Sequence, residues 1–207
     1  MTLYKNKYRI ESARKPGWDY STPGYYFITV CTFNRKYLFG YIADGKMVLN
    51  DFGRIVQKEW DKSFLIRREL VRDEFVIMPN HFHGIVQLVG GGNNDTGIAT
   101  PVETSGRTSL RGTKQMPRLR PKSISSFMAG VKSVITRQIN DIRNTPGERV
   151  LQYRFHDHII RNDQELFKIR NYINNNPSNW ENDKLNRAIG DRVQETMAPY
   201  REDSWMI

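Results

Sequence analysis

The chain has 207 residues, 38% of them hydrophobic and 12% aromatic, which suits one folded domain with a core and excludes a disordered chain. The formal net charge of +10 favours a polyanionic partner, because basic side chains that neutralise phosphates release condensed counterions. Cys31 is the only cysteine, which excludes an intramolecular disulfide framework and a cysteine zinc cluster. No apolar run has the length of a signal peptide core or a membrane span, so we expect a cytoplasmic protein without a membrane partner.

The first half of the chain predicts strands and one helix. Residues 25–33 are aromatic and β-branched, which is typical of a buried strand. Asp44-Gly45 lies between two apolar runs and predicts a tight hairpin, and Asn50 is placed to cap a helix after it. Residues 70–78 and 82–89 predict two further strands, separated by a turn at Met78-Pro79-Asn80.

The composition changes sharply at Gly90. Residues 90–122 are rich in Gly, Ser, Thr and Pro, and we expect them to form a mobile basic loop inserted in the domain. This loop is interpreted equally well as a DNA-binding arm that contacts phosphates or as a solvated linker. Its candidate DNA-binding residues are Arg107, Arg111, Lys114, Arg118, Arg120 and Lys122.

Helical spacing of apolar residues predicts a helix over 123–143, and 155–161 predicts another strand. Asn162 and Glu165 have the spacing of a capping box and predict the start of a helix. This helix runs to Asn175, and Pro177 ends it. These elements predict an α+β fold, an antiparallel β-sheet with helices packed mainly on one face. We expect one domain over residues 1–180 and a C-terminal tail over 181–207.

All four histidines of the chain fall into two His-x-His pairs on predicted strands. Strand alternation places His81 and His83 on one face, where both rings can bind one cation. His156 and His158 leave three interpretations open: a metal site of four histidines, a supporting or DNA-contacting role, or a surface cluster without function.

Tyr172 and Asn176 are four residues apart and lie on one edge of the predicted last helix, beside its apolar face. A tyrosine in such a place can act as a covalent nucleophile. On the residues alone, packing is the commoner role for a tyrosine beside an apolar stripe.

Three segments, taken together and in order, resemble a known family. IMPNHFHGIVQL is similar to the HUH strand of single-tyrosine transposases, and GWDYSTPGYYFITVCTFNRKYLFG and RFHDHIIRNDQELFKIRNYINNNPSNW match the branch called REP-associated tyrosine transposases (RAYT). The matching segments cover about residues 16–90 and 123–180. The resemblance implies an HUH nuclease fold of the ferredoxin or RRM-like kind.

The resemblance also implies a site and a reaction. His81 and His83 would be metal ligands, Tyr172 the catalytic nucleophile, and Asn176 the third ligand where many relatives have glutamine. The metal would be Mg²⁺ or Mn²⁺, and the substrate single-stranded hairpin DNA, nicked and rejoined through a 5′-phosphotyrosine. Tyr153 is the competing tyrosine, but it lacks the helix and the Asn-Pro that follow the family's nucleophile.

Other functions remain open beside this one. They are an HUH replication initiator or relaxase, a domesticated module that binds DNA without cutting it, and a small zinc hydrolase that uses all four histidines. Family members work as monomers or as homodimers, and no feature of the sequence decides between these states.

Overall fold

Four antiparallel strands form the central sheet of the computed structural model, which describes residues 3–4, 8–9, 14–90 and 120–186. Their order is β6-β7-β3-β8, so the first strand of the sheet along the chain lies at its centre. The strands are β3 (Gly24–Cys31), β6 (Leu70–Met78), β7 (His81–Leu88) and β8 (His156–Ile160). Two short antiparallel pairs stand outside this sheet: β1 (Leu3–Tyr4) with β2 (Tyr8–Arg9), and β4 (Gly40–Ala43) with β5 (Lys46–Leu49).

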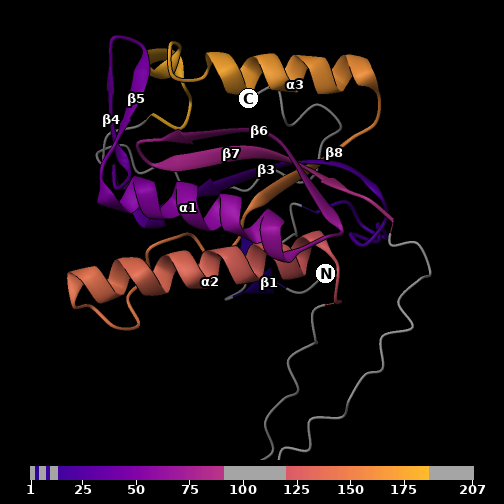
Figure 1. Cartoon of the computed structure of the whole chain (residues 1–207), viewed down its shortest axis with the longest axis horizontal. Helices are drawn as coiled ribbons and strands as arrows, with labels where there is room; N and C mark the ends of the chain where they lie inside the picture. Colours follow the sequence, from indigo (N-terminus) through magenta and orange to yellow (C-terminus); the bar gives the residue numbers. More distant parts are fainter. Residues whose placement is uncertain (1–2, 5–7, 10–13, 91–119, 187–207) are drawn as a thin grey trace, which may run out of the picture.

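Three α-helices cover the two faces of the sheet (Figure 1). Helices α1 (Asp51–Ile66) and α2 (Ile124–Arg143) contact each other on one face, and α3 (Asp163–Asn175) lies across the other. Two short 3-10 helices, η1 (Phe33–Arg35) and η2 (Trp180–Asn182), complete the described elements. The predicted α+β fold is confirmed, with two of the three α-helices on one face. Within the described part of the chain, no helix is both long enough and apolar enough to span a membrane.

The main core lies between the sheet and helices α1 and α2. Its centre is Trp60, which is fully buried and stacks on Phe75 with ring centroids 4.5 Å apart. Gly84 of β7 permits this packing, because a Cβ added there would lie 2.5 Å from the Trp60 ring. Burying an aromatic side chain of this size contributes on the order of 1.5–3 kcal/mol, so the core holds β7 firmly in place.

A smaller apolar cluster on the opposite face holds α3 against the sheet. Its buried members are Phe27, Ile85 and Ile160 from the strands with Leu166, Ile169 and Ile173 from the helix. At one end of this face the strand register pairs Cys31 with His81, and Thr29 with both His83 and His156. His81, His83 and His156 therefore lie at one end of the sheet, which has α3 packed on one of its faces.

The local signals in the sequence act largely as expected. Asp44 and Gly45 have φ of 50° and 69° in the β4–β5 turn, and the Asn50 side chain accepts a hydrogen bond from the Gly53 N–H. The Asn162 side chain likewise accepts from the Glu165 N–H at the start of α3. The Glu165 carboxylate accepts from the Arg161 N–H instead of closing a capping box, because it is also paired with His158. Cys31 ends β3 and is partly exposed there.

Candidate metal and tyrosine site

His81 and His83 bring their ring nitrogens together at the start of β7. Their Nε2 atoms lie 3.0 Å apart, and the two side chains are 0% and 2% exposed. The alternation of side chains along the strand puts both rings on the α3 face and sends Phe82, also fully buried, into the main core. The pair is therefore fixed from both sides of the sheet.

Each histidine ring has a polar neighbour at its Nδ1 atom. The Nδ1 atom of His81 lies 2.7 Å from Oδ1 of Asn80, and Nδ1 of His83 lies 2.8 Å from Oγ1 of Thr29. If each Nδ1–H donates to its oxygen neighbour, the lone pairs of both Nε2 atoms point toward each other. This arrangement is common among metal-binding histidines, whose second nitrogen is held by a hydrogen bond.

Burial keeps both rings neutral. It lowers the pKa of His83 to about 3, with a further contribution from the charge of His156. It also lowers the pKa of His81 well below its usual value, and the charges of His83 and Arg35 act in the same direction. Neutral imidazoles are the form that binds cations, so both rings can act as ligands near neutral pH.

Asp183 supplies a carboxylate beside the two histidines. One ligand atom from each of His81, His83 and Asp183 lies within 4.8 Å of the others, and Oδ2 of Asp183 is 3.7 Å from Nε2 of His81. Asn80 holds this region of the chain in place, because its Nδ2 donates to the Leu185 carbonyl oxygen at 2.7 Å. Burial raises the pKa of Asp183 against opposing contributions from its polar neighbours, which is expected for a carboxylate that lacks a full partner.

Sequence reasoning missed Asp183, Asn80 and Thr29. Asp183 lies in the stretch expected to be a tail, and no spacing links it to the histidines. Asn80 precedes His81 directly, and Thr29 belongs to a predicted strand, but only the β3–β7 register pairs it with His83. The three residues become visible as part of the site only once the fold is known.

Tyr172 reaches the histidines from α3. Its hydroxyl lies 3.2 Å from Nε2 of His83, and the edge of its ring packs on Phe27 with centroids 6.2 Å apart. Burial and then the charge of Asp183 raise the pKa of Tyr172 to about 12, although a hydrogen bond from Asn176 opposes this rise. The phenol is thus protonated at neutral pH without a cation.

Asn176 is buried one turn after Tyr172, with 4% of its surface exposed. Its side chain hydrogen-bonds toward both Tyr172 and Asp183, and its buried Oδ1 has no hydrogen-bond partner. An amide oxygen without a partner is costly to bury, so a ligand at this position would satisfy it.

A pocket of about 370 Å³ opens beside the Tyr172 ring. Five of its nine lining residues are asparagines from α3 and the segment after it, and Lys168, Lys184 and Asp183 also line it. The amides are Asn171, Asn175, Asn176, Asn179 and Asn182. The amides offer uncharged donors and acceptors, and the two lysines outnumber the one carboxylate, Asp183.

The second histidine pair does not complete a site of four histidines. Among the residues that the structure describes, the cluster of possible ligands contains His81, His83 and Asp183 but neither His156 nor His158. His158 is instead paired with Glu165, with Nε2 and Oε1 2.8 Å apart. His156 lies in register with Thr29, and burial lowers its pKa to about 4. Tyr153, the competing tyrosine, is 87% exposed, whereas the histidine pair on β7 is buried.

The predicted basic arm falls mostly outside the described residues. Arg107, Arg111, Lys114 and Arg118 lie in the range 91–119, so their DNA-binding role stays a prediction. Arg120 and Lys122 precede α2, and the Arg120 guanidinium forms an ion pair with Asp19. The Arg120 side chain is 72% exposed, so this pair leaves it accessible to another anion.

No family model matches the chain. The chain is 33% identical over 174 residues to an uncharacterized protein of Haemophilus influenzae, which covers 84% of this chain and 91% of that protein. Among solved structures, a REP-associated tyrosine transposase bound to a REP hairpin is similar with a TM-score of 0.52 and 18% identity, over 91% of this chain and 98% of that one. A structure from Deinococcus radiodurans R1 is more distant, with a TM-score of 0.40 and 14% identity over 78% of this chain and 97% of that one.

The likeness to the transposase structure confirms the fold implied by the resemblance in the sequence. The 33% identity with the Haemophilus influenzae protein extends over most of both chains, so the two proteins are related. The chain belongs to one family with the uncharacterized Haemophilus influenzae protein, and it has the fold of a REP-associated tyrosine transposase.

Proposed function

We propose that this chain is a metal-dependent endonuclease and strand transferase that acts on single-stranded hairpin DNA, with Tyr172 as its nucleophile. The observation that carries the proposal is that Nε2 of His83 lies 3.2 Å from the Tyr172 hydroxyl and 3.0 Å from Nε2 of His81. The solved structure with this fold has a REP hairpin bound, and the net charge of +10 suits such a partner.

The residues at the site fit a divalent cation. Two neutral imidazole nitrogens, the Asp183 carboxylate and the buried Oδ1 of Asn176 together offer nitrogen and oxygen ligands. This mixed set suits Mn²⁺ better than Mg²⁺, which prefers oxygen alone. A cation bound here would supply Lewis-acid polarisation of a phosphate and stabilise the negative charge that develops on it.

The protein's own part in the reaction is to place and activate the phenol. Tyr172 would attack phosphorus in line, so that its Oη–P bond forms as the bond from phosphorus to the 3′ oxygen breaks. The proton lost from Oη would pass to solvent through the adjoining pocket, and the released 3′ oxygen would take up a proton from solvent. The products are a 5′-phosphotyrosine and a free 3′-hydroxyl, and attack by another 3′-hydroxyl rejoins the strands without external energy.

The site also needs rigid geometry, because a small displacement of a nucleophile lowers the rate strongly. Phe27 packs on both the His83 ring and the Tyr172 ring, with centroids 5.2 Å and 6.2 Å away. The apolar cluster beneath α3 fixes the helix on the sheet. These contacts support a nucleophile that is placed before the substrate arrives.

The test is a covalent adduct. The protein is incubated with labelled single-stranded hairpin DNA and Mn²⁺, and a species that survives denaturation is sought on a gel. Tyr172→Phe should abolish this species and leave hairpin binding nearly unchanged. An adduct that forms equally well with Tyr172→Phe would overturn the assignment of the nucleophile.

The alternatives give other outcomes in the same experiment. A module that only binds DNA would retain the hairpin and form no adduct in any metal. A zinc hydrolase would hold stoichiometric zinc and hydrolyse a substrate that is not nucleic acid. A replication initiator or relaxase would form the same adduct but on a different DNA target.

A further inference from the structure

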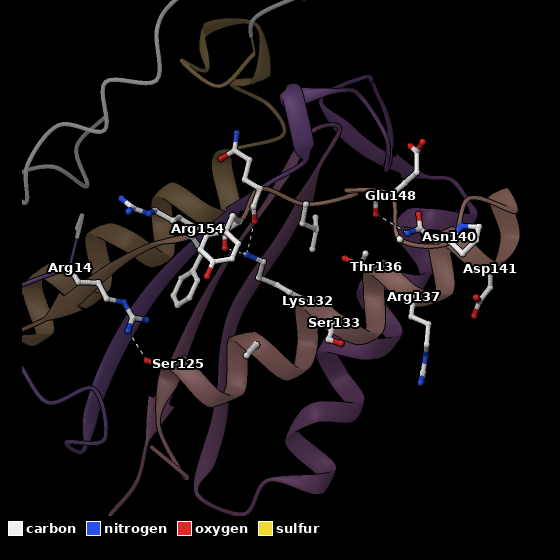
Figure 2. Close-up of a pocket in the computed structure, with 17 residues that line it drawn as sticks. Arg14, Ser125, Lys132, Ser133, Thr136, Arg137, Asn140, Asp141, Glu148 and Arg154 are labelled. Atoms are coloured by element: carbon white, nitrogen blue, oxygen red, sulfur yellow. Dashed lines mark hydrogen bonds between the residues drawn. The ribbon is translucent and has the colours of Figure 1, made fainter. Parts of the chain in front are cut away.

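A second and larger hollow lies between helix α2 and the segment 146–155, with a volume of about 810 Å³ (Figure 2). This volume is within the range of sites that hold small ligands or single nucleotides. Four cations, two anions and two aromatic rings, those of Tyr153 and Phe155, are among its lining residues. The charged residues are Arg14, Lys132, Arg137, Arg154, Asp141 and Glu148.

The hollow begins at the same end of the sheet as the histidine and tyrosine site. Leu151 forms a β-bridge with Thr32, and the Gln152 N–H donates to the Cys31 carbonyl oxygen at 2.9 Å. Cys31 is in turn the register partner of His81 on the other side of β3. The segment that forms one wall of the hollow is therefore attached one strand away from the candidate ligands.

Lys132 fixes the shape of that wall. Its Nζ donates to the carbonyl oxygens of Gln152 at 2.6 Å and of Tyr153 at 2.8 Å, and it points from α2 toward this segment (Figure 2). Arg14 lies over the Tyr20 ring at 4.4 Å and the Phe155 ring at 5.0 Å, and its Nη1 donates to Ser125. Lys132 and Arg14 are thus held in place by contacts with neighbouring residues.

The contacts that order this wall do not account for the exposure of the Tyr153 side chain. Its side chain is 87% exposed, although Lys132 holds its backbone in place. An exposed tyrosine on an otherwise ordinary surface needs no function. Here, however, it stands beside a hollow in which cations predominate, and aromatic rings interleaved with basic side chains are typical of surfaces that bind single-stranded nucleic acid.

We infer that this hollow binds the single-stranded DNA that flanks the hairpin, with a base stacked on Tyr153 and phosphates beside Arg137 and Arg154. The inference rests on the proposed function, because it concerns the same substrate, and it assigns a second contact region to that substrate. The strand would pass from the tyrosine site around the β8 edge of the sheet and along α2.

The experiment uses the full chain with Tyr172→Phe and a chelator, so that cleavage does not affect the binding measured. Fluorescence anisotropy compares a blunt hairpin with the same hairpin carrying ten thymidines on one side or the other. Tyr153→Ala should weaken binding of one extended hairpin at least about fivefold, the effect of losing one stacked base. Binding of the blunt hairpin should not change.

Three further variants make the test specific. Tyr153→Trp should restore binding, because an indole also stacks on bases. Tyr41→Ala is the matched control, since Tyr41 is 62% exposed on β4 and does not line the hollow. Arg137→Ala should lower the slope of log affinity against log salt by about 0.7, the value for one phosphate of single-stranded DNA.

The inference is overturned if Tyr153→Ala and Arg137→Ala bind both extended hairpins as tightly as the parent does. It is equally overturned if the parent binds the extended hairpins no more tightly than the blunt one. Neither result bears on covalent adduct formation, which is read with the Tyr172 side chain intact. The failure of this inference is therefore distinct from the failure of the proposed function.

Discussion

Asn80 Oδ1 lies 2.7 Å from Nδ1 of His81, and the same Asn80 side chain donates through Nδ2 to the Leu185 carbonyl oxygen. One buried amide thus links the orientation of a candidate ligand to the chain segment that carries Asp183. We predict that Asn80→Ala weakens Mn²⁺ binding by about 10- to 100-fold, as is usual when a partner of a metal ligand is removed. Titration calorimetry measures this affinity.

A matched variant separates the two roles of Asn80. Asn80→Asp keeps an oxygen acceptor for His81 but cannot donate to Leu185. Its Mn²⁺ affinity should lie between that of the parent and that of Asn80→Ala. Equal affinities for all three proteins would show that Asn80 has no part in orienting the site.

The Mn²⁺ affinities of Asp183 and Asn176 variants show which of these residues is the third metal ligand. We predict that Asp183→Asn weakens Mn²⁺ binding more than Asn176→Ala does, because a carboxylate contributes a full charge and an amide contributes only a dipole. The measurement is again calorimetric titration with Mn²⁺. The reverse order would favour Asn176 as the third ligand, as the resemblance implied.

Arg170 and Asp73 connect α3 to the bulged part of β6. The guanidinium Nε donates to Oδ1 of Asp73 at 2.9 Å, and Nη2 donates to Oδ2, so the pair is bidentate. Arg170 precedes Tyr172 by two residues, so we predict that Arg170→Ala lowers the rate of adduct formation several-fold while Mn²⁺ affinity stays the same. Gel quantitation of the adduct over time gives the rate.

The control for Arg170 is Arg54→Ala, which removes an exposed ion pair with Asp51 on α1, far from the nucleophile in the sequence. It should leave the rate unchanged. If Arg170→Ala and Arg54→Ala form the adduct equally fast, the Arg170–Asp73 pair does not position α3.

Stability should fall on acidification because buried histidines are kept neutral. The folded pKa values of His83, about 3, and His156, about 4, lie below the unfolded value of 6.5. Between pH 6.5 and about 4 the unfolded chain binds more protons, so stability present above pH 6.5 is lost as the pH falls. Each residue contributes about 1.4 kcal/mol per pH unit in that window.

Urea unfolding at pH 7.5, 6.0 and 5.0, with a chelator present, measures this loss. Asp157 and Asp183 have raised pKa values and partly oppose it, because the folded state takes up their protons at a higher pH. His83→Asn should reduce the slope of the unfolding free energy against pH below 6.5. An unchanged slope in that variant would contradict the neutral state of His83.

The sequence predicted the fold well because its signals are local. The Asp44-Gly45 turn, the Asn50 and Asn162 caps and the alternation through His81, Phe82 and His83 each depend on neighbours only a few residues away. Such signals set where elements begin and end. They do not set which strands pair.

The parts of the site that escaped prediction depend on long-range pairing. Thr29 meets His83 across 54 positions of the chain, and Asn80 meets Leu185 across 105. The approach of Tyr172 to His83 across 89 positions was expected only through the family resemblance. Residue types and spacing alone favoured packing for that tyrosine, and its contact with Phe27 shows that it does pack as well.

The central claim is that Tyr172 becomes covalently linked to the 5′ phosphate of the cleaved strand. The direct measurement is mass spectrometry of the adduct after digestion with nuclease and trypsin. Trypsin should release residues 171–184 as a peptide with Tyr172 as its only tyrosine, and we predict that this peptide carries the nucleotide. A nucleotide on residues 150–154, the peptide that contains Tyr153, or on no peptide at all would contradict the account.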